Sequence, residues 1–547
     1  MNLLASKNRQ ALLNKLANET FDLLLIGGGI TGAGIALDAA SRGLKVALVE
    51  KQDFAQGTSS RSTKLIHGGL RYLKQGDLKL VKEVGSERAI VHKNAPHLVI
   101  PEKMLLPLID GGTYGKTPTS VGLWVYDVLA GVKGDDRRKM LSKEQTLNKE
   151  PLLNPKTLKG SGYYAEYRTD DARLTMGIIK TASEQGAACA NHCEATKLLY
   201  SEGGITGVKV KDHMLEQEFS IEAKYIVNAT GPWVDHIREE DNSLKGKRLH
   251  LTKGVHLVVS HQKLPLKQSL YFDVPDGRMI FAIPRGKITY IGTTDTNYKG
   301  KLEEPKTTLE DAEYLLNSIN QTFPTINLTM EDIESSWAGL RPLIHQDGKS
   351  PSELSRRDEI FESNSGLISI AGGKLTGYRK MSQRVVDLVL RKMKRGEKCQ
   401  TKTITIKGGD FASHQAVKEY IAQVNQQLTL EGFDHYAAEY LVSNYGTQTQ
   451  EVLQKYAQLK VENPENSPRL TLALAELHFC LEHEAVFTLE DFFNRRTGRL
   501  YFDIQSVKEL VESIAQEMQI QLGWTEAVLQ KNRVNLQKLM GTLETFA

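Results

Sequence analysis

A glycine-rich turn near the start of the chain constrains its fold more than any other feature. Residues 21–26 (FDLLLI) have the length and apolar character of a buried strand, and the pattern Gly27-x-Gly29-x-x-Gly32 follows at once. Residues 33–42 then read as a helix, with a glycine at the expected stop. Because a glycine turn at a helix N-terminus lets a pyrophosphate approach unpaired backbone N–H groups, this unit predicts dinucleotide binding.

A second strand and an acid complete the unit. Residues 45–49 (KVALV) are typical of a buried strand and lead directly into Glu50. At this position an acid accepts hydrogen bonds from a ribose 2′-hydroxyl and repels a 2′-phosphate, which disfavours NADP. FAD and NAD remain as candidate cofactors. A glycine-rich turn with no ligand is the structural alternative.

The residues that follow Glu50 help to decide between FAD and NAD. A plain nicotinamide enzyme continues with alternating strands and helices, whereas residues 57–72 (GTSSRSTKLIHGGLRY) are rich in small hydroxyls, glycines and cations. Hydroxyls and backbone N–H groups bind phosphates, and Gly68 with Gly69 lets a flat ring lie against the main chain. The stretch favours FAD, although out of context it reads as an ordinary loop.

The rest of the chain changes character along its length. Residues 251–295 alternate apolar and polar positions between turns, which is typical of antiparallel sheet. After about residue 405 glycines become rare, and we interpret this part as a separate helical domain, with helices predicted at 415–430, 437–443, 449–459, 470–482 and 507–519. Residues 1–20 read as an amphipathic helix that either packs on its own protein or lies on a membrane surface.

The charge, length and apolar content of the chain exclude several classes of protein. Lys and Arg number 70 and Asp and Glu 66, a near balance that argues against a dedicated nucleic-acid binder. The 547 residues are long enough for about two to four domains. No apolar run approaches a membrane span, and the N-terminus lacks the apolar core of a secretory signal. The first 400 residues are net basic, which suggests an anionic ligand or surface, or else a chance imbalance of surface charge.

The cysteines favour reduced thiols and no metal site. There are four of them in the whole chain, too few for a disulfide framework. Cys189 and Cys193 flank His192, but no second Cys/His pair completes a zinc pattern. We therefore predict that the chain binds no metal.

Eight segments, taken in order, resemble the FAD-dependent glycerol-3-phosphate dehydrogenases of the aerobic bacterial and mitochondrial type. They cover about residues 20–400, and the tail resembles the C-terminal helical domain of longer members. Together they are far more specific than any one motif. The matching segments are GGGITGAGIALDAASRG, TSSRSTKLIHGGLRYL, RTDDARL, VNATGPWVD, KGVHLVV, IGTTDT, GLRPL and GGKLTGYRK.

The resemblance implies an α/β fold with three parts. The first is an FAD-binding, Rossmann-like domain of glutathione-reductase type, expected at residues 1–100, 170–250 and 350–400. The second is a substrate-binding domain with an antiparallel sheet, expected at 101–169 and 251–349. The third is a C-terminal helical domain at 401–547. In this family the Asp170-Asp171 pair, which invites a metal interpretation, belongs to a structural turn.

The resemblance also implies the reaction and its partners. The substrate is expected to be sn-glycerol 3-phosphate, oxidised at C2 to dihydroxyacetone phosphate with hydride transfer to FAD and electrons passed to a membrane quinone. The family is cytoplasmic and peripheral at the inner face of the cytoplasmic membrane. No nucleic-acid partner is expected, and a homodimer is left open.

Three cations and one histidine are the candidate substrate residues. A phosphate dianion needs fixed cations, and the planar guanidinium of arginine suits it best. In the family the arginine of GLRPL and the lysine of GGKLT line the active site, which assigns those roles to Arg341 and Lys374. Arg357 is a further candidate for the substrate, and its alternative is a surface ion pair with Asp358. Histidine titrates near neutral pH, so His256 is our candidate for the base that takes the hydroxyl proton, although a histidine on a strand is more often structural.

The remaining candidates are expected to contact FAD, and His67 to touch its isoalloxazine ring. The family binds the flavin without a covalent bond, and we expect the same here. The candidate cofactor residues are Gly27, Gly29, Gly32, Glu50, Thr58, Ser59, Ser60, Lys64, Leu65, His67, Gly68, Thr230, Gly231, Gly373, Leu375 and Thr376.

Three other functions stay open at the level of sequence. A glycerol-3-phosphate oxidase that produces hydrogen peroxide shares nearly all the motifs, but the oxidases carry an extra inserted segment that is not obvious here. A flavin-binding protein without turnover has no need for a charged pocket. An amino-acid oxidase of similar fold predicts reduction by amino acids instead.

Overall fold

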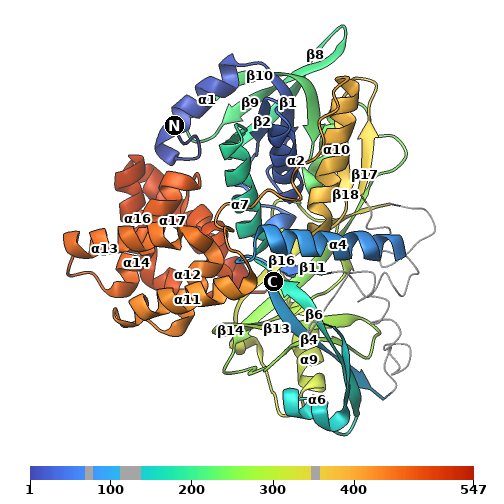
Figure 1. The fold of residues 1–547 in the computed structure, drawn as a ribbon, viewed down its shortest axis with the longest axis vertical. Helices are drawn as coiled ribbons and strands as arrows, with labels where there is room; N and C mark the ends of the chain where they lie inside the picture. The colour runs from blue at the N-terminus through green and yellow to red at the C-terminus, as the bar shows by residue number, and fades with distance from the viewer. Residues whose placement is uncertain (68–77, 111–136, 346–357, 547) are drawn as a thin grey trace.

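The computed structural model describes residues 1–67, 78–110, 137–345 and 358–546, and the side chains of 78–80 are not described. The chain forms two large sheets with a body of helices beside them (Figure 1). Strands of the first sheet fall at 21–49, 188–228 and 358–372, and those of the second at 65–66, 100–168 and 249–344. Both sheets are therefore assembled from segments far apart in the sequence.

The first sheet has eight strands within the described residues, of which the central ones are parallel. Its main order is β17-β18-β10-β1-β2-β7, and β8 and β9 form a hairpin that continues β10. The bounds are β1 (Phe21–Ile26), β2 (Val46–Val49), β7 (Ala188–Ala190), β8 (Cys193–Ser201), β9 (Gly204–Asp212), β10 (Gln217–Asn228), β17 (Asp358–Glu362) and β18 (Ile368–Gly372).

Helices cover this first sheet closely. The apolar run of β1 is buried along almost its whole length, as a central parallel strand requires. α2 (Ile30–Ser41) packs against α7 (Asp171–Glu184) and α10 (Tyr378–Lys392). Gly34 permits the α2–α10 contact, because a Cβ there would lie 2.4 Å from the Ser382 Oγ. The predicted strand–turn–helix–strand unit is present.

The second sheet has ten strands in the described part of the chain and is mostly antiparallel. Its main order is β15-β11-β14-β13-β12-β4-β6-β3, with β16 beside β11 and β5 beside β6. The bounds are β3 (Leu65–Ile66), β4 (Ile100–Ile109), β5 (Lys139–Ser142), β6 (Leu158–Arg168), β11 (Leu249–Ser260), β12 (Ser269–Asp273), β13 (Met279–Arg285), β14 (Ile288–Gly292), β15 (Thr296–Asn297) and β16 (Ile333–Ile344). Three further helices are α4 (Leu78–Asn94), α6 (Lys143–Lys149) and α9 (Leu309–Thr322).

The C-terminal helices form a body of their own, drawn in orange and red in Figure 1. Its helices include the predicted five, a short α15, a π-helical turn at 491–496 and a long final helix that sequence patterns missed. The bounds are α11 (His414–Thr429), α12 (His435–Tyr445), α13 (Thr449–Glu462), α14 (Pro468–His483), α15 (Arg499–Phe502), α16 (Ile504–Leu522) and α17 (Glu526–Glu544).

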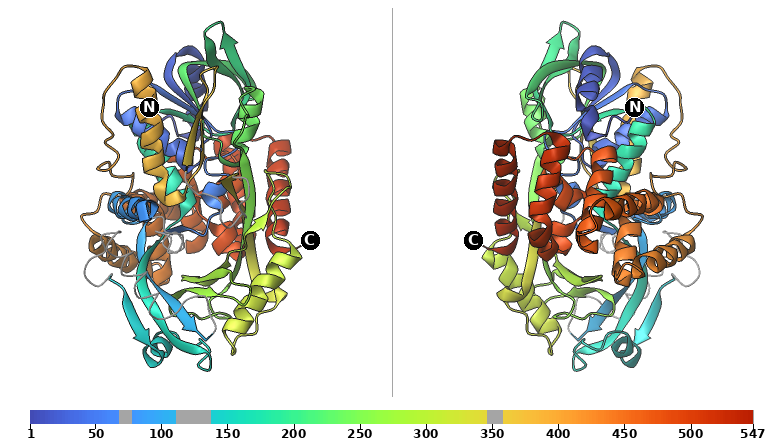
Figure 2. Two further views of the ribbon diagram at one scale, coloured as in Figure 1. Left: turned by 90° about the vertical axis from the view of Figure 1, so that its right-hand side faces the viewer. Right: turned by 90° about the vertical axis from the view of Figure 1, so that its left-hand side faces the viewer.

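The helical body holds strand β16 of the second sheet. The Ser335 hydroxyl donates to the Tyr501 carbonyl at 2.7 Å, and the Ser336 hydroxyl to the Leu543 carbonyl at 3.1 Å. The Tyr501 ring also packs on Trp337 of the same strand, with ring centroids 5.1 Å apart. Figure 2 shows the C-terminal helices standing against this sheet.

The N-terminal helix packs on its own protein. α1 (Arg9–Asn18) buries Leu12, Leu13 and Leu16 beneath the first sheet, in one cluster with its strands. The Arg9 guanidinium forms a buried ion pair with Asp212. Of the two interpretations of residues 1–20, the packed helix is the one in the structure. Among the described residues, moreover, no helix combines the length and apolarity needed to cross a membrane.

Candidate active site

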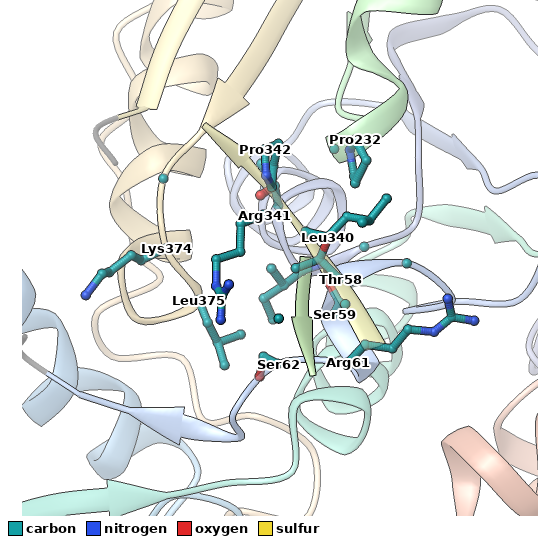
Figure 3. A pocket seen from close by; sticks show the side chains of 18 of the residues that line it. Thr58, Ser59, Arg61, Ser62, Pro232, Leu340, Arg341, Pro342, Lys374 and Leu375 are labelled. Atoms are coloured by element: carbon teal, nitrogen blue, oxygen red, sulfur yellow. Dashed lines mark hydrogen bonds between the residues drawn. The ribbon is translucent and has the colours of Figure 1, made fainter. Parts of the chain in front are cut away.

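One large cavity, with a volume of about 970 Å³, is lined by both sheets. The first sheet contributes the ends of β1 and β2 and the loop after β18, and the second contributes residues of β11, β13 and β16. Figure 3 shows the part of this cavity where residues 58–62, 340–342 and 374–375 meet. A volume at the upper end of small-molecule pockets suits a dinucleotide together with a small substrate.

The glycine turn lies at one end of this cavity. Gly27 has φ +112°, and a Cβ there would lie 2.7 Å from the Ala229 carbonyl oxygen. A Cβ on Gly32 would lie 1.9 Å from the Gly27 carbonyl oxygen, so Gly32 serves the tight packing of the turn and does not line the cavity. Backbone at Gly27 and Gly29 faces the cavity at the start of α2. A pyrophosphate therefore has the open N-terminus of a helix to bind.

Glu50 occupies the position expected of a ribose-binding acid. Its carboxylate accepts hydrogen bonds from the Gly28 N–H at 2.7 Å and the Gln52 N–H at 3.0 Å, and it lines the cavity. Burial raises the pKa of Glu50, and the nearby Asp53 carboxylate adds to this increase. An acceptor held at the cavity wall fits the hydroxyl donors of a ribose, so cavity, turn and acid together fit FAD.

The hydroxyl-rich segment is divided between cavity and core. Thr58, Ser59, Leu65 and His67 line the cavity, and the Thr58 hydroxyl donates to the Leu340 carbonyl at 2.6 Å. The His67 ring meets the Phe281 ring edge-on, with centroids 6.1 Å apart. Gly68 lies outside the described residues.

Lys64 and Ser60 do not line the cavity. The Lys64 side chain is buried and forms an ion pair with Asp171 at the start of α7, and it donates to the Ser60 carbonyl at 3.0 Å. The structure thus assigns Lys64 to holding the segment on α7, because its ammonium is already neutralised there. Asp170 caps the same helix by accepting from the Arg173 N–H at 3.0 Å, so the acidic pair is structural.

The other predicted flavin residues surround the cavity. Thr230 and Gly231 follow β10, and Gly373, Leu375 and Thr376 follow β18, and all five line it. The Thr376 hydroxyl donates to the His67 carbonyl at 3.3 Å, which joins the loop after β18 to the hydroxyl-rich segment.

Arg341 is held on the cavity wall by one loop. Its guanidinium donates to the Thr293 hydroxyl at 2.8 Å and the Thr294 carbonyl at 3.1 Å, and forms an ion pair with Asp295 at 3.2 Å. It lies against the backbone of Gly254, where a Cβ would come within 2.2 Å of the Arg341 Nη2. A planar cation fixed in this way is suited to a phosphate.

The two predicted cations do not converge. Lys374 lines the cavity, but in Figure 3 its side chain points away from the Arg341 guanidinium. Arg357, the third candidate, lies outside the described residues. Of the three candidate phosphate ligands, Arg341 and Lys374 thus both line this cavity, with their side chains pointing in different directions.

His256 lies on β11 at the cavity, almost fully buried. Its Nε2 atom is 3.0 Å from the Thr63 hydroxyl oxygen. Burial lowers the pKa of His256 well below its usual range, and the Arg341 and Lys64 cations lower it further. The imidazole is therefore neutral near pH 7, the form in which it can accept a proton.

Several cavity residues were not predicted. Thr63 and Arg61 lie inside the hydroxyl-rich segment 57–72, and Thr293 and Asp295 belong to the IGTTDT motif. The motifs themselves were therefore a usable signal, but they do not say which side chains face inward. Tyr271 and Arg278, by contrast, carry no pattern that marks them.

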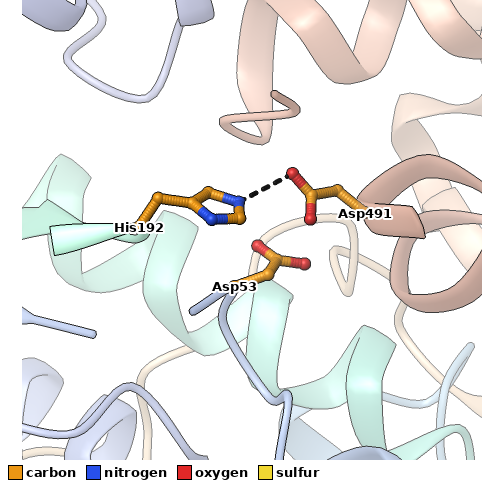
Figure 4. Close-up of side chains that lie close together, drawn as sticks. All are labelled: Asp53, His192 and Asp491. Carbon is orange, nitrogen blue, oxygen red and sulfur yellow. Dashed lines mark hydrogen bonds and ion pairs between the residues drawn. The ribbon is translucent and has the colours of Figure 1, made fainter. Parts of the chain in front are cut away.

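A second polar cluster lies where the helical body meets the first sheet (Figure 4). His192 Nε2 is 2.9 Å from an Asp491 carboxylate oxygen, and Asp53 lies beside them. Arg496 forms an ion pair with Asp53 at 2.7 Å, and Arg495 pairs with both carboxylates, so these charges are already compensated. Cys189 and Cys193 do not join the cluster, and burial raises the pKa of each thiol to about 12.

Two family models match the chain. Residues 22–379 match the FAD-dependent oxidoreductases, and residues 399–529 match the C-terminal domain of alpha-glycerophosphate oxidase. Among curated proteins, the aerobic glycerol-3-phosphate dehydrogenase of Bacillus subtilis is 52% identical over 541 residues, covering 98% of this chain and 97% of the relative. That of Staphylococcus haemolyticus is 50% identical over 96% of this chain and 95% of the relative.

Solved structures show the same likeness. The glycerol-3-phosphate dehydrogenase from Bacillus halodurans, complexed with FAD, is 43% identical and superposes with a TM-score of 0.85, covering 99% of each chain. The L-alpha-glycerophosphate oxidase from Mycoplasma pneumoniae, with FAD bound, is 21% identical, with a TM-score of 0.55, and covers 68% of this chain and 95% of that chain. The second likeness is one of fold.

Proposed function

This chain belongs to the aerobic glycerol-3-phosphate dehydrogenases, a family of FAD-dependent oxidoreductases, and on that basis we propose that it oxidises sn-glycerol 3-phosphate to dihydroxyacetone phosphate and passes the electrons to a quinone. The observation that carries the proposal is the joining of three features in one cavity: the glycine turn with Glu50, the fixed cation Arg341 and the neutral imidazole of His256. Bound FAD, held without a covalent bond, supplies the two-electron acceptor for this oxidation.

Arg341 binds the phosphate group of the substrate. Its guanidinium is oriented by Thr293 and Asp295, so little conformational freedom is lost when a phosphate is bound. Asp295 offsets only part of the positive charge of Arg341. The positive charge that is left favours binding of a phosphate dianion over binding of a neutral alcohol. Lys374 contributes a second cation if its side chain turns toward Arg341.

His256 takes the proton of the C2 hydroxyl. Burial and the neighbouring cations keep it neutral, so its lone pair is available at physiological pH. Removing this proton as the C–H bond breaks avoids a positively charged carbonyl oxygen. The nearby cation Arg341 also stabilises negative charge that develops on the substrate oxygen.

Quinone is the proposed acceptor rather than oxygen. The relatives at about 50% identity are named dehydrogenases, whereas the likeness to the oxidase structure is one of fold. The net basic first 400 residues suit contact with an anionic membrane surface, and we propose a peripheral position at the inner face of the cytoplasmic membrane.

The visible spectrum of the anaerobic holoprotein tests the proposal. We expect the oxidised flavin band to bleach with sn-glycerol 3-phosphate and to persist with glycerol or amino acids. The bleached enzyme is then mixed either with a short-chain quinone or with air. Rapid reoxidation by quinone and slow reoxidation by air support the dehydrogenase. Rapid reoxidation by air with release of hydrogen peroxide identifies an oxidase, and a flavin that never bleaches refutes the proposed substrate.

A further inference from the structure

The His256 imidazole is clamped between two neighbouring strands. Its register partners are Gly292 on β14 and Trp337 on β16. The Trp337 ring stacks on it, with centroids 4.8 Å apart and planes inclined by 12°. Gly292 lies against the ring, because a Cβ there would be 2.2 Å from the His256 Cδ2. The ring therefore has one plane available to it.

The Thr63 hydroxyl holds the edge of the same ring. Its oxygen is 3.0 Å from Nε2 of His256. Two aromatic side chains fix the backbone that carries this hydroxyl, because the Tyr290 hydroxyl donates to the Thr63 carbonyl at 3.2 Å and the Trp337 Nε1–H donates to the Ser62 carbonyl at 3.1 Å. Trp337 thus orients both the imidazole and the segment that contacts it.

The hydrogen-bond partners indicate which nitrogen carries the proton. Among the described residues, Nε2 of His256 is the one acceptor near the Thr63 hydroxyl hydrogen, and Nδ1 is enclosed without a partner. The Thr63 hydroxyl lines the cavity and is only half-buried, whereas Nδ1 is enclosed, so no group in the cavity reaches that nitrogen. Nε2 is therefore the nitrogen that can receive a proton from the cavity, which requires that Nδ1 carries the proton of the neutral ring.

We propose that Thr63 carries the proton between the substrate and His256: its hydroxyl donates to Nε2 and keeps the lone pair of the base on that atom. The inference rests on the proposed function. As the C2 hydroxyl loses its proton to the Thr63 oxygen, the Thr63 O–H bond breaks and its hydrogen becomes bonded to Nε2. The Thr63 oxygen then accepts a hydrogen bond from Nε2–H. One hydroxyl thus serves both the neutral and the protonated ring, which a methyl group cannot do.

The charged and titratable groups around the ring come from several elements. Arg341 on β16 and Lys64 before β3 are the cations that act on His256, and Asp171 of α7 neutralises Lys64. Tyr290 of β14 lies 6.5 Å away between ring centroids, and burial raises its pKa, so it stays a neutral hydrogen-bond donor. These surroundings are the same in a Thr63→Val variant, which isolates the role of the hydroxyl.

The test compares three variants of the holoenzyme. Thr63→Val removes the hydroxyl at constant size, Thr63→Ser keeps it, and Thr252→Val makes the same change on β11 at a buried hydroxyl that does not line the cavity. For Thr63→Val we expect flavin reduction by substrate to slow about 10- to 100-fold with little change in KM. Thr63→Ser is expected to stay within about threefold of the wild type, because it retains the hydrogen bond.

The pH profile separates this role of the hydroxyl from a purely structural one. Without an acceptor for Nε2–H, the protonated imidazole is disfavoured, so the acid limb of kcat/KM moves to lower pH by about one unit in Thr63→Val. Thr63→Ser and Thr252→Val are expected to keep the wild-type limb. A Thr63→Val enzyme with wild-type rate and limb overturns the proposal.

A second readout does not depend on turnover. In the holoenzyme labelled with ¹⁵N-histidine, the His256 signals are identified by their loss in His256→Asn. We expect Nε2 to resonate as the unprotonated nitrogen in the wild type and this preference to weaken in Thr63→Val. A protonated Nε2 in the wild type overturns the inference. If the wild-type flavin does not bleach with sn-glycerol 3-phosphate, the proposed function fails, while the NMR comparison still decides the assignment of the tautomer.

Discussion

The carboxylate of Glu50, at the end of β2, accepts a hydrogen bond from the Gly28 N–H in the glycine turn, with a distance of 2.7 Å. A Cβ on Gly28 would approach the Glu50 Cβ to 2.8 Å, so the two residues are in contact as well as hydrogen bonded. The acid and the turn are therefore one rigid unit. A ligand that binds the turn with its phosphates meets the acid with its sugar.

Replacing this acid is expected to weaken flavin binding. Glu50→Gln keeps the size but turns part of the acceptor into a donor, which cannot accept from a ribose hydroxyl. We expect the dissociation constant for FAD to rise about tenfold, the effect of one charge-assisted hydrogen bond. Quenching of flavin fluorescence on titration into apoprotein measures it. Glu222→Gln, an exposed change on β10, is the control, and equal affinities in the two variants would contradict the role of Glu50.

The fixed geometry of Arg341 predicts that its charge alone is not enough. Arg341→Lys keeps the cation but loses the planar contacts to Thr293 and Asp295. We expect KM for sn-glycerol 3-phosphate, and the inhibition constant of inorganic phosphate, to rise about 10- to 100-fold. Steady-state kinetics with a quinone acceptor provides both values. Arg391→Lys on the exposed side of α10 should change neither, and an unchanged KM in Arg341→Lys would exclude Arg341 as the phosphate ligand.

The close approach of Gly292 to the His256 ring predicts a sharp effect of a single methyl group. Gly292→Ala would place its Cβ 2.2 Å from the His256 Cδ2, so the imidazole must leave its position beside Trp337. We expect kcat to fall about 100-fold, since a misplaced base loses most of its contribution. Rapid mixing with substrate measures flavin reduction. Gly396→Ala, where nothing lies within 4 Å of the new Cβ, is the matched control.

The cluster in Figure 4 predicts a dependence of stability on pH. Burial alone would lower the pKa of His192, but the Asp491 carboxylate outweighs it and raises the pKa. The raised value means that this pair stabilises the fold fully below the unfolded pKa of about 6.5, and that the contribution is lost as pH rises through the folded pKa. We expect the melting temperature to fall over that range on the alkaline side of pH 6.5.

A histidine variant isolates this contribution. In His192→Gln the melting temperature is expected to lose the fall above pH 6.5 that the Asp491 pair produces. His435→Gln, which alters an exposed histidine of α12, is expected to keep the wild-type slope. A wild-type slope in His192→Gln would mean that the pH dependence arises elsewhere.

Sequence patterns predicted well those parts of the fold that depend on contacts between residues close together in the chain. The βαβ unit around Gly27 and Glu50 is encoded within thirty residues or so, and its apolar runs, glycines and acid all act on near neighbours. The helices after residue 405 were found for the same reason, except the four-residue α15 and the final α17, in which Leu529, Leu536 and Leu543 are the buried residues. The packed position of α1 depends on distant partners such as Asp212, so the pattern of residues 1–20 left two alternatives.

Side-chain direction within a motif is what sequence patterns did not predict. Lys64 and Thr63 are adjacent in the hydroxyl-rich segment, and Lys64 but not Thr63 was among the candidate contacts of FAD. In the structure Lys64 faces Asp171, 107 residues further along the chain, whereas Thr63 faces the cavity and His256. No periodicity in the segment distinguishes the two, because an irregular loop has no repeating face.

The hydrogen bonds between β16 and the C-terminal helices connect the last part of the chain to the wall of the cavity. Ser335 and Ser336 are bonded to residues 501 and 543, and the same strand carries Arg341 on the wall of the cavity. We expect a ligand whose binding tightens this strand to slow amide hydrogen exchange in α15 and α17 as well, and any such coupling is reciprocal, so that tightening those helices strengthens ligand binding by the same coupling free energy. In this way the stability of the final helix, α17, would be linked to ligand binding at a cavity that begins with the glycine turn near the start of the chain.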